Sequence, residues 1–284
     1  MNRLSIILPA KNEAPALAEL LPRLRAAQPA AEIIVVDDGS TDDTRRVCAE
    51  AGVACLSSPY PMGNGAAIKR GARAARGDVL VFMDGDGQHD PADVARLLAR
   101  LEEGYDMAVG ARDWGSQAGV GRGVANTLYN WLATRMTGHQ VVDLTSGFRA
   151  VRADKFREFL YLLPNGFSYP TTSTMAFFRS AYPVAYVPIK AAQRVGKSHI
   201  KPIKDGVRFL LIIFKIATLY SPLKLFAPAS AVFFLSGCAN YGWTFLHESR
   251  LTNGSTLLWS AAVIVFLIGL VSEQITALMY RRDA

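Results

Sequence analysis

The chain has few cysteines, few histidines and no internal repeat or low-complexity segment. Its three cysteines, Cys48, Cys55 and Cys238, are odd in number and lack the spacing of metal ligands, which excludes a disulfide framework or a zinc finger. The four histidines form no spaced cluster. Too few apolar residues precede Pro9 and Lys11 to make a signal peptide. These absences favour a reducing, cytoplasmic setting for the N-terminal domain.

Acidic charge is also in deficit, because 31 basic residues outnumber 24 acidic ones and give a formal net charge of +7. From about Leu225 onward the chain is almost uncharged, and basic residues concentrate just before that point. No basic stretch is interleaved with aromatic residues in the manner of a nucleic-acid site. The charge pattern therefore favours a membrane surface over nucleic acid as a partner.

Short apolar runs alternate with helical patterns from Arg3 to about Tyr186, which predicts an α/β domain with a mostly parallel sheet covered on both faces. The predicted strands are 4–8, 33–36, 53–57, 79–83, 106–110 and 184–188, and the predicted helices are Ala14–Ala27, Thr41–Ala51, Gly65–Ala75 and Pro91–Glu103. Ser40 or Thr41 is expected to cap the second helix and Asp90 the last.

Polar loops that carry carboxylates follow three of these strands. The strand at 79–83 runs into Asp84-Gly85-Asp86-Gly87-Gln88-His89, the strand at 33–36 into Asp37-Asp38, and the first strand into the loop 9–13. The carboxyl ends of parallel strands share one edge of a sheet, where ligands bind in open α/β folds. The sequence therefore predicts one site at this edge.

The acidic pair at the end of the strand 79–83 suits a metal that binds phosphates. Asp84 and Asp86 can share one divalent cation, and Gln88 would be a neutral third ligand. Taken alone, Asp-x-Asp can also be an ordinary acidic turn after a strand, because short motifs occur by chance.

Two long apolar runs, Leu225–Leu246 and Leu257–Tyr280, each reach the roughly 20 residues that cross a hydrocarbon core of about 30 Å. The connector His247–Thr256 carries one arginine, whereas basic residues precede the first run and follow the second. The positive-inside rule therefore predicts a cytoplasmic N-terminal domain and C-terminus on a plasma membrane. Glu273, within the second run, should face a protein partner or the interface.

Residues 201–224 are predicted to form an amphipathic helix between the domain (1–200) and the spans (225–284). Arg208 and Lys215 are seven residues apart and share one helical face, as in helices that lie in the membrane interface. A helix packed in the core of a soluble domain is the alternative.

Several short motifs occur in order along the chain: Pro9-Ala10-Lys11-Asn12-Glu13, Asp37-Asp38-Gly39-Ser40-x-Asp42-x-Thr44, Gly63-Asn64-Gly65-Ala66-Ala67-Ile68-Lys69, Asp84-Gly85-Asp86-Gly87-Gln88-His89-x-Pro91 and Ser146-Gly147-Phe148-Arg149. With these motifs the chain resembles the inverting family-2 glycosyltransferases of GT-A fold, and more narrowly the polyprenyl-phosphate glycosyltransferases, which include dolichol-phosphate mannose synthase and bacterial undecaprenyl-phosphate sugar transferases. The resemblance covers roughly residues 3–224. The acidic motif departs from it by reading Asp-Gly-Asp where Asp-Ala-Asp is frequent.

The resemblance implies a nucleotide-sugar donor. The donor-binding residues that it implies are Pro9, Ala10, Asn12, Glu13, Asp38, Gly65, Lys69, Asp84, Arg194 and Lys197. Asp84, Asp86 and Gln88 would bind Mg²⁺ or Mn²⁺ on its pyrophosphate, where the metal offsets charge on the departing nucleoside diphosphate. The segment 63–69 would present free N–H groups and Lys69 to phosphate, or form only a glycine-rich turn before a surface helix.

The resemblance also implies a lipid-phosphate acceptor, since guanidinium groups bind phosphate oxygens well. The acceptor-phosphate residues that it implies are Arg112, Arg122, Asn126, Ser146 and Arg149. Any one of these arginines can instead be a solvated surface charge. A phosphate monoester, with a second pKa near 6, is already a nucleophile at neutral pH and needs no essential base. Asp143 is the candidate base or sugar-hydroxyl ligand if one is used, or else a turn carboxylate.

The predicted function is inverting transfer of one sugar from a GDP- or UDP-linked donor to dolichyl or undecaprenyl phosphate, by a homo-oligomer such as a tetramer. A processive polysaccharide synthase is one alternative, but Gln193-Arg194 does not continue into the Gln-x-x-Arg-Trp pattern of those enzymes. A non-catalytic nucleotide-sugar sensor or lipid-scrambling partner is the other. The intact acidic motif argues against it.

Overall fold

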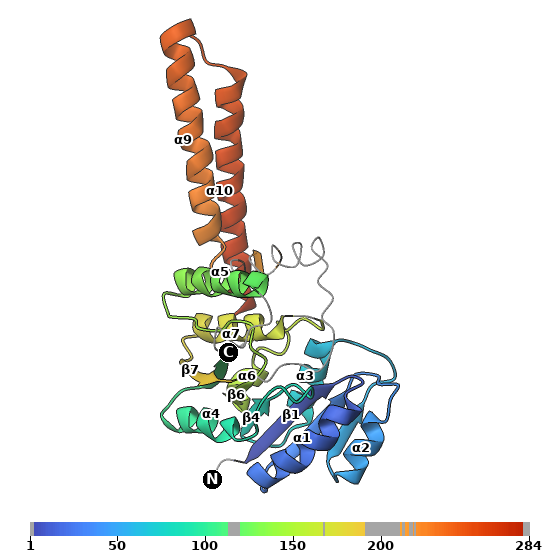
Figure 1. The fold of residues 1–284 in the computed structure, drawn as a ribbon. Helices are drawn as coiled ribbons and strands as arrows, with labels where there is room; N and C mark the ends of the chain where they lie inside the picture. The colour runs from blue at the N-terminus through green and yellow to red at the C-terminus, as the bar shows by residue number, and fades with distance from the viewer. Residues whose placement is uncertain are drawn as a thin grey trace.

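The computed structural model describes residues 3–112, 120–166, 168–190, 211, 214–215, 218 and 220–280. Within them, seven strands form one sheet in the order β3-β2-β1-β4-β6-β5-β7 (Figure 1). The strands are β1 (Leu4–Ala10), β2 (Glu32–Asp37), β3 (Ala54–Ser57), β4 (Val79–Phe82), β5 (Met107–Arg112), β6 (Arg149–Arg152) and β7 (Val184–Ile189). The helices are α1 (Ala14–Ala27), α2 (Thr44–Glu50), α3 (Asn64–Ala74), α4 (Asp93–Glu102), α5 (Val120–Thr137), α6 (Ala153–Arg157), α7 (Tyr169–Arg179), α9 (Leu223–Glu248) and α10 (Asn253–Met279).

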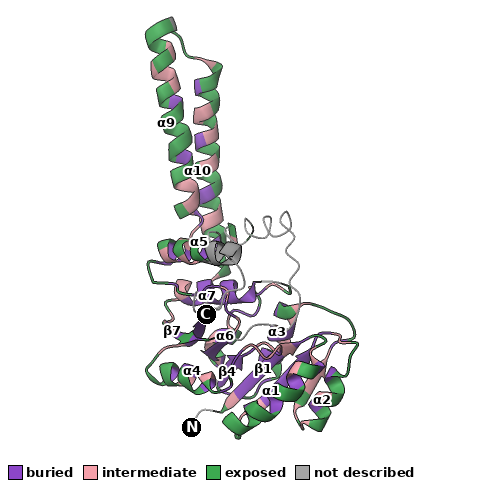
Figure 2. Cartoon of the chain, viewed as in Figure 1, coloured by how far each residue is buried: buried purple, intermediate pink, exposed green. Residues whose placement is uncertain are grey.

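The mostly parallel sheet that the sequence predicts is confirmed, and all six predicted strands lie within two residues of their predicted bounds. β1 pairs in parallel with both β2 and β4, and β5 pairs in parallel with β7. Side chains alternate between the two faces of each strand, so neighbouring residues of β1 enter different cores. Ile6 and Leu8 pack with α1, α2 and α4, whereas Ile7 packs with α3, α6 and α7. Figure 2 shows the buried strands between these two helical layers.

β6 was not predicted from the sequence; it pairs antiparallel with β4 on one side and with β5 on the other. The strand has only four residues and begins and ends with arginine, so it lacks the apolar run of a buried strand. Arg149 is nevertheless fully buried, because groups of α7 accept its hydrogen bonds. A buried charge of this kind cannot be recognised from hydrophobic periodicity.

Two predicted helix caps are wrong. α2 begins at Thr44, three residues later than predicted, and Ser40 and Thr41 instead bond to Asn12 in the loop after β1. α4 begins at Asp93, and the Asp90 carboxylate accepts a hydrogen bond from the Ala92 N–H just before the helix. A contact between two loops decides the first, and such a contact is not encoded locally, whereas Asp90 forms its hydrogen bond within its own loop.

The two apolar helices at the C-terminal end, α9 and α10, form an antiparallel hairpin that projects from the domain (Figure 1). Both are long and apolar enough to cross a membrane, and most of their surface is exposed (Figure 2). The two helices approach closely at two glycines. A Cβ added at Gly237 would lie 2.6 Å from Trp259 Cδ1, and a Cβ added at Gly269 would lie 2.5 Å from Phe226 Cβ. Of the predicted amphipathic helix 201–224, residues 201–210, 212–213, 216–217 and 219 lie outside the described residues, so this prediction is not tested.

The N-terminus of α3 docks on the loop 164–166. Its first free N–H groups donate to that loop, from Gly65 to the Gly166 carbonyl at 3.1 Å and from Ala66 to the Asn165 carbonyl at 2.8 Å. A Cβ at Gly65 would lie 2.0 Å from the Pro164 carbonyl oxygen. Because backbone carbonyls accept the hydrogen bonds of these two N–H groups, the structure argues against their predicted interaction with a phosphate.

Gly65→Ala is expected to destabilise the domain by about 1–3 kcal/mol, because the added methyl overpacks this contact. The measurement is the thermal unfolding midpoint of the purified chain in detergent. Gly166→Ala is the matched control on the other side of the contact. An added Cβ there meets no heavy atom within 4 Å, so a change below about 0.5 kcal/mol is expected. Equal shifts for the two variants would contradict this account.

Candidate active site

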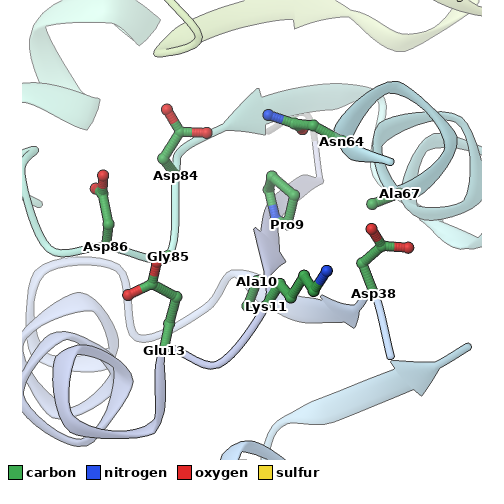
Figure 3. A pocket seen from close by; sticks show the side chains of 10 residues that line it. All are labelled: Pro9, Ala10, Lys11, Glu13, Asp38, Asn64, Ala67, Asp84, Gly85 and Asp86. Carbon is green, nitrogen blue, oxygen red and sulfur yellow. The ribbon is translucent and has the colours of Figure 1, made fainter. Parts of the chain in front are cut away.

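A cleft of about 420 Å³ lies at the carboxyl ends of β1, β2 and β4, as the sequence predicts (Figure 3). Its lining residues are Pro9, Ala10, Lys11, Glu13, Asp38, Asn64, Ala67, Asp84, Gly85 and Asp86. The two aspartates of the acidic motif and Glu13 lie on one side of the cleft, and Asp38 lies on the other with Lys11 extending towards it. The three polar loops thus meet in one cavity.

Asn12 holds two of these loops together. Its backbone has a φ of 55°, its amide oxygen accepts a hydrogen bond from the Thr41 N–H at 2.8 Å, and its own N–H donates to Ser40 Oγ at 2.9 Å. Asn12 is not among the residues that line the cleft. The structure therefore supports a role in positioning the loops and not the predicted direct contact with a donor.

The paired aspartates after β2 have different surroundings. Asp37 is fully buried and accepts hydrogen bonds from the Ser40 N–H and from Arg45 Nε, at 2.8 and 2.7 Å. Burial raises the pKa of Asp37, but these hydrogen bonds outweigh it and hold the pKa below its usual value. Asp38 accepts hydrogen bonds from the N–H groups of Met62 and Gly63 and still lines the cleft. Only Asp38 is placed to meet a ligand.

Asp84 and Asp86 follow β4 and are both half-buried in the cleft wall. The Gln88 N–H donates to Asp86 Oδ1 at 3.2 Å, so Gln88 lies beside this pair, although it is not among the lining residues. The described residues contain no group of three histidine, cysteine, aspartate or glutamate side chains arranged around a metal position. Two carboxylates and one amide leave positions open, which suits a cation whose other ligands are phosphate oxygens.

A second cavity of about 130 Å³ adjoins the first and shares Asn64 and Asp84 with it. Its other lining residues are Thr145, Gly147, Gly166, Ser168, Tyr169, Pro170 and Thr171. The last three form the first turn of α7, whose N-terminus carries positive partial charge. A ligand that fills both cavities would meet Asp84 from both sides.

Lys215 brings a positive charge to the rim of the second cavity. Its Nζ donates to Ser168 Oγ at 3.4 Å, and the side chain is half-buried. Burial lowers the pKa of Lys215. No ion pair within 4.0 Å links Lys215 to a carboxylate among the described residues. From the sequence this lysine was predicted to face lipid headgroups, and its position next to the site was not predicted.

Arg112 and Asp143 form an ion pair at 2.8 Å below the second cavity, and the Asp143 side chain is only 3% exposed. Asp143 also accepts hydrogen bonds from the N–H groups of Thr145 and Ser146. Burial raises the pKa of Asp143, but these hydrogen bonds and the charge of Arg112 hold the pKa below its usual value. Such a carboxylate is a poor proton acceptor, which argues against the predicted base.

Arg112 reaches the second cavity through Thr145. Arg112 Nη2 donates to Thr145 Oγ1 at 2.8 Å, and Thr145 lines the cavity. The Arg112 side chain is 28% exposed. Its geometry is compatible with the predicted acceptor contact, with Asp143 holding the guanidinium in place.

The buried position of Arg149 argues against its predicted contact with an acceptor phosphate. Its guanidinium donates to the Pro170 carbonyl, Ser173 Oγ and Thr174 Oγ1 of α7, at 3.0, 2.8 and 3.1 Å, and also to the Ser146 carbonyl. Ser146 is buried as well, and neither residue lines either of the two cavities described above. Arg149 instead fixes β6 to α7.

Lys69 is not among the residues that line the cleft. Its Nζ donates to the Leu163 carbonyl at 3.1 Å and to Asn165 Oδ1, so it anchors the loop that receives α3. The structure thus argues against the predicted phosphate contacts of Lys69 and Gly65. Arg194 and Lys197 lie outside the described residues, and Arg122 and Asn126 lie on α5 at positions whose side chains are not described.

The missed residues that line the second cavity come from two segments. Thr145 and Gly147 flank the predicted residue Ser146, which is itself buried and does not line this cavity. Ser168 precedes α7 and Tyr169 is its first residue, and no motif marks either of them. The αL backbone of Ser168, with a φ of 79°, was not detectable either.

Two family models match the chain. "Glycosyl transferase family 2" matches residues 5–160, and "GtrB C-terminal hairpin" matches residues 221–278. The solved structures that resemble it include glucosyl-3-phosphoglycerate synthase from Mycobacterium tuberculosis, in complexes with Mn²⁺ and UDP-glucose or with Mg²⁺ and UDP. The Mn²⁺ complex has a TM-score of 0.62 and 24% identity over 76% of this chain and 79% of that chain, which shows a shared GT-A fold.

Similar curated proteins include undecaprenyl-phosphate sugar transferases. The undecaprenyl-phosphate 4-deoxy-4-formamido-L-arabinose transferase of Proteus mirabilis is 33% identical over 54% of this chain and 49% of its own length. This chain therefore spans about half the length of that relative. The undecaprenyl-phosphate mannosyltransferase of Micrococcus luteus is 32% identical over 69% of this chain and 86% of its own length. The chain belongs to glycosyl transferase family 2.

Proposed function

We propose that the protein transfers one sugar from a nucleotide-sugar to a polyprenyl phosphate at a membrane surface. The observation that carries the proposal is the pair of adjoining cavities that share Asp84, one at the edge of the sheet and one at the N-terminus of α7. The two relatives named above use undecaprenyl phosphate by name, which supports this choice of acceptor.

The larger cavity would bind the nucleotide-sugar. Asp38 and the segment Pro9–Lys11 would contact the nucleoside, with Glu13 at the opposite wall. Asp84 and Asp86, with Gln88 beside them, would hold Mg²⁺ or Mn²⁺, which stabilises the charge that develops on the leaving nucleoside diphosphate. The neighbours crystallised with Mn²⁺ or Mg²⁺ support a divalent metal in general.

The smaller cavity would bind the acceptor phosphate. The N-terminus of α7, Lys215 and Arg112 supply positive charge around it, which offsets repulsion between the acceptor and the donor pyrophosphate. The dianionic phosphate attacks the anomeric carbon in line with the departing diphosphate, so the sugar is transferred with inversion. No protein base is required, consistent with the low basicity of Asp143.

The hairpin of α9 and α10 would anchor the chain in the membrane and bring the lipid to the cavities. The excess of basic residues on the domain side supports a cytoplasmic domain, by the positive-inside rule. We propose the plasma membrane as the location and a homo-oligomer as the assembled form.

The test uses the purified full chain in detergent, Mn²⁺, a short polyprenyl phosphate and a panel of labelled GDP- and UDP-sugars. Label that enters the organic phase with one donor, and that disappears when EDTA is added, is the expected result. A long polymer among the products would indicate a processive synthase instead. Nucleotide binding without a lipid product from any donor would refute the proposed function.

Asp86→Ala is expected to lower kcat at least about 100-fold, because charge on the leaving group would lose its metal-mediated stabilisation. The measurement is turnover at saturating donor and metal. Asp154→Asn, an exposed carboxylate on α6, is the matched control and should leave kcat unchanged. Full activity of Asp86→Ala would exclude the metal role of this carboxylate.

The pH dependence of the transfer rate tests whether the reaction needs a protein base. The rate should rise with pH through the second pKa of the acceptor phosphate, near 6. Asp143→Asn should lower the rate by displacing Arg112, and the pH at which the rate rises should stay unchanged. Loss of this rising limb in Asp143→Asn would instead indicate that Asp143 acts as the base.

The depressed folded-state pKa of Asp143 also has a consequence for stability. The contribution of Asp143 to the free energy of unfolding is present at neutral pH and is lost as the pH falls through the folded-state pKa.

Lys215→Gln is expected to raise the KM for polyprenyl phosphate roughly tenfold, since charge-assisted contacts contribute about 1.5–3 kcal/mol. The affinity for the nucleotide should not change, because Lys215 lies at the smaller cavity. Steady-state kinetics with each substrate varied in turn measure both. Lys190→Gln, at an exposed position after β7, is the control. An effect on nucleotide affinity alone would contradict the placement of the acceptor.

A further inference from the structure

Glu273 is the only charged residue of α10. α10 has 27 residues and a length of about 40 Å, which exceeds a hydrocarbon core of roughly 30 Å. Glu273 follows Asn253 by twenty positions, or about 30 Å along the axis. The carboxylate therefore falls where the helix would leave the hydrocarbon on the side of the catalytic domain.

Glu273 ties three segments together. Its Oε1 lies 3.4 Å from Arg179 Nη1 at the end of α7. Its Oε2 accepts hydrogen bonds from Ser221 Oγ at 2.8 Å and from the Leu223 N–H, the first residue of α9, at 3.2 Å. The carboxylate thus joins the base of both hairpin helices to the catalytic domain.

Arg179 also makes several contacts at this junction. Its guanidinium donates to the Tyr220 carbonyl and lies 6.0 Å and 5.9 Å from the ring centroids of Tyr220 and Tyr280. The side chains of Arg179 and Glu273 are only 23% and 22% exposed. A charge pair so little exposed is costly to break, since removing one partner leaves the other charge without compensation.

α7 connects this junction to the second cavity. Its first turn lines that cavity, Ser173 and Thr174 in its middle hold Arg149, and Arg179 is its last residue. The helix has 11 residues and a length of about 16 Å. Figure 1 shows α7 between the sheet and the hairpin. One rigid helix therefore has the acceptor cavity at one end and the membrane hairpin at the other.

We propose that the Arg179–Glu273 ion pair is a positioning device at the membrane boundary, which fixes the hairpin on α7 so that a lipid phosphate meets the second cavity. Because the carboxylate cannot enter hydrocarbon unpaired, the pair sets both the depth and the angle of the domain. An apolar contact would supply stability without this constraint. The lipid part of the inference rests on the proposed function, whereas the structural part does not.

The experiment uses the full chain in vesicles of defined phospholipid composition. Cysteines replace exposed Glu103 at the end of α4 and Leu246 near the end of α9, and carry spin labels for a distance measurement. Cys55→Ser and Cys238→Ser remove the accessible native thiols, while Cys48 is fully buried. The variants are Glu273→Gln and the charge exchange Arg179→Glu with Glu273→Arg. The matched control is Glu50→Gln, which breaks the exposed Arg46–Glu50 pair on α2.

Glu273→Gln is expected to broaden the distance distribution, and the charge exchange to narrow it again, while Glu50→Gln leaves it unchanged. An unchanged distribution in Glu273→Gln would overturn the proposal. If Glu273→Gln does not fold, as judged by nucleotide binding, the charge-exchange variant decides. A distance distribution as narrow as that of the chain with the native ion pair supports the proposal. A broad distance distribution overturns it.

Kinetics supply a second readout. Glu273→Gln should raise the KM for a long-chain polyprenyl phosphate roughly tenfold, within the range of coupling between contacting residues, and leave the KM for a short, water-soluble one unchanged. Equal losses with both acceptors would overturn the positioning role. If the unsubstituted chain makes no lipid product, the proposed function fails, and the distance measurement still decides whether the ion pair fixes the hairpin.

Discussion

The parallel pairing of β1 with β2 and β4 is the constraint on which the site depends. Because the three strands run in the same direction, their carboxyl ends lie along one edge, and the loops after them must meet there. The cleft, the acidic pair and Asp38 all follow from that arrangement. Hydrogen bonds between the loops, such as those of Asn12, then fix their relative position.

Several charged residues in the described part of the chain bind other protein groups. Asp143 holds Arg112, Arg149 joins β6 to α7, and Lys69 anchors the loop opposite α3. Each is buried or half-buried, where a charge without a partner would be costly. Their role is to hold the walls of the two cavities, and the residues free to meet substrates are fewer than the motifs alone indicate.

α7 takes part in several of these contacts and connects them. It covers one face of the sheet, receives Arg149 from β6 and contributes its first turn to the second cavity. Its last residue bonds to the hairpin. In the proposed reaction the donor is soluble and the acceptor is a lipid, and a rigid link of this kind would bring together two substrates that approach from different phases.

The sequence by itself determined the α/β class, six of the seven strands, the hairpin and the position of the acidic motif, because apolar periodicity and strand ends are local properties. Only the tertiary structure decided that β6 is a strand, that Arg149 is buried, that Lys69 bonds to Leu163 and Asn165, and that Asp143 binds Arg112. An arginine or a carboxylate has the same sequence signature whether it meets a substrate or a protein group. Its partner is chosen by residues brought near by the fold, as the second cavity and the Arg179–Glu273 pair both show.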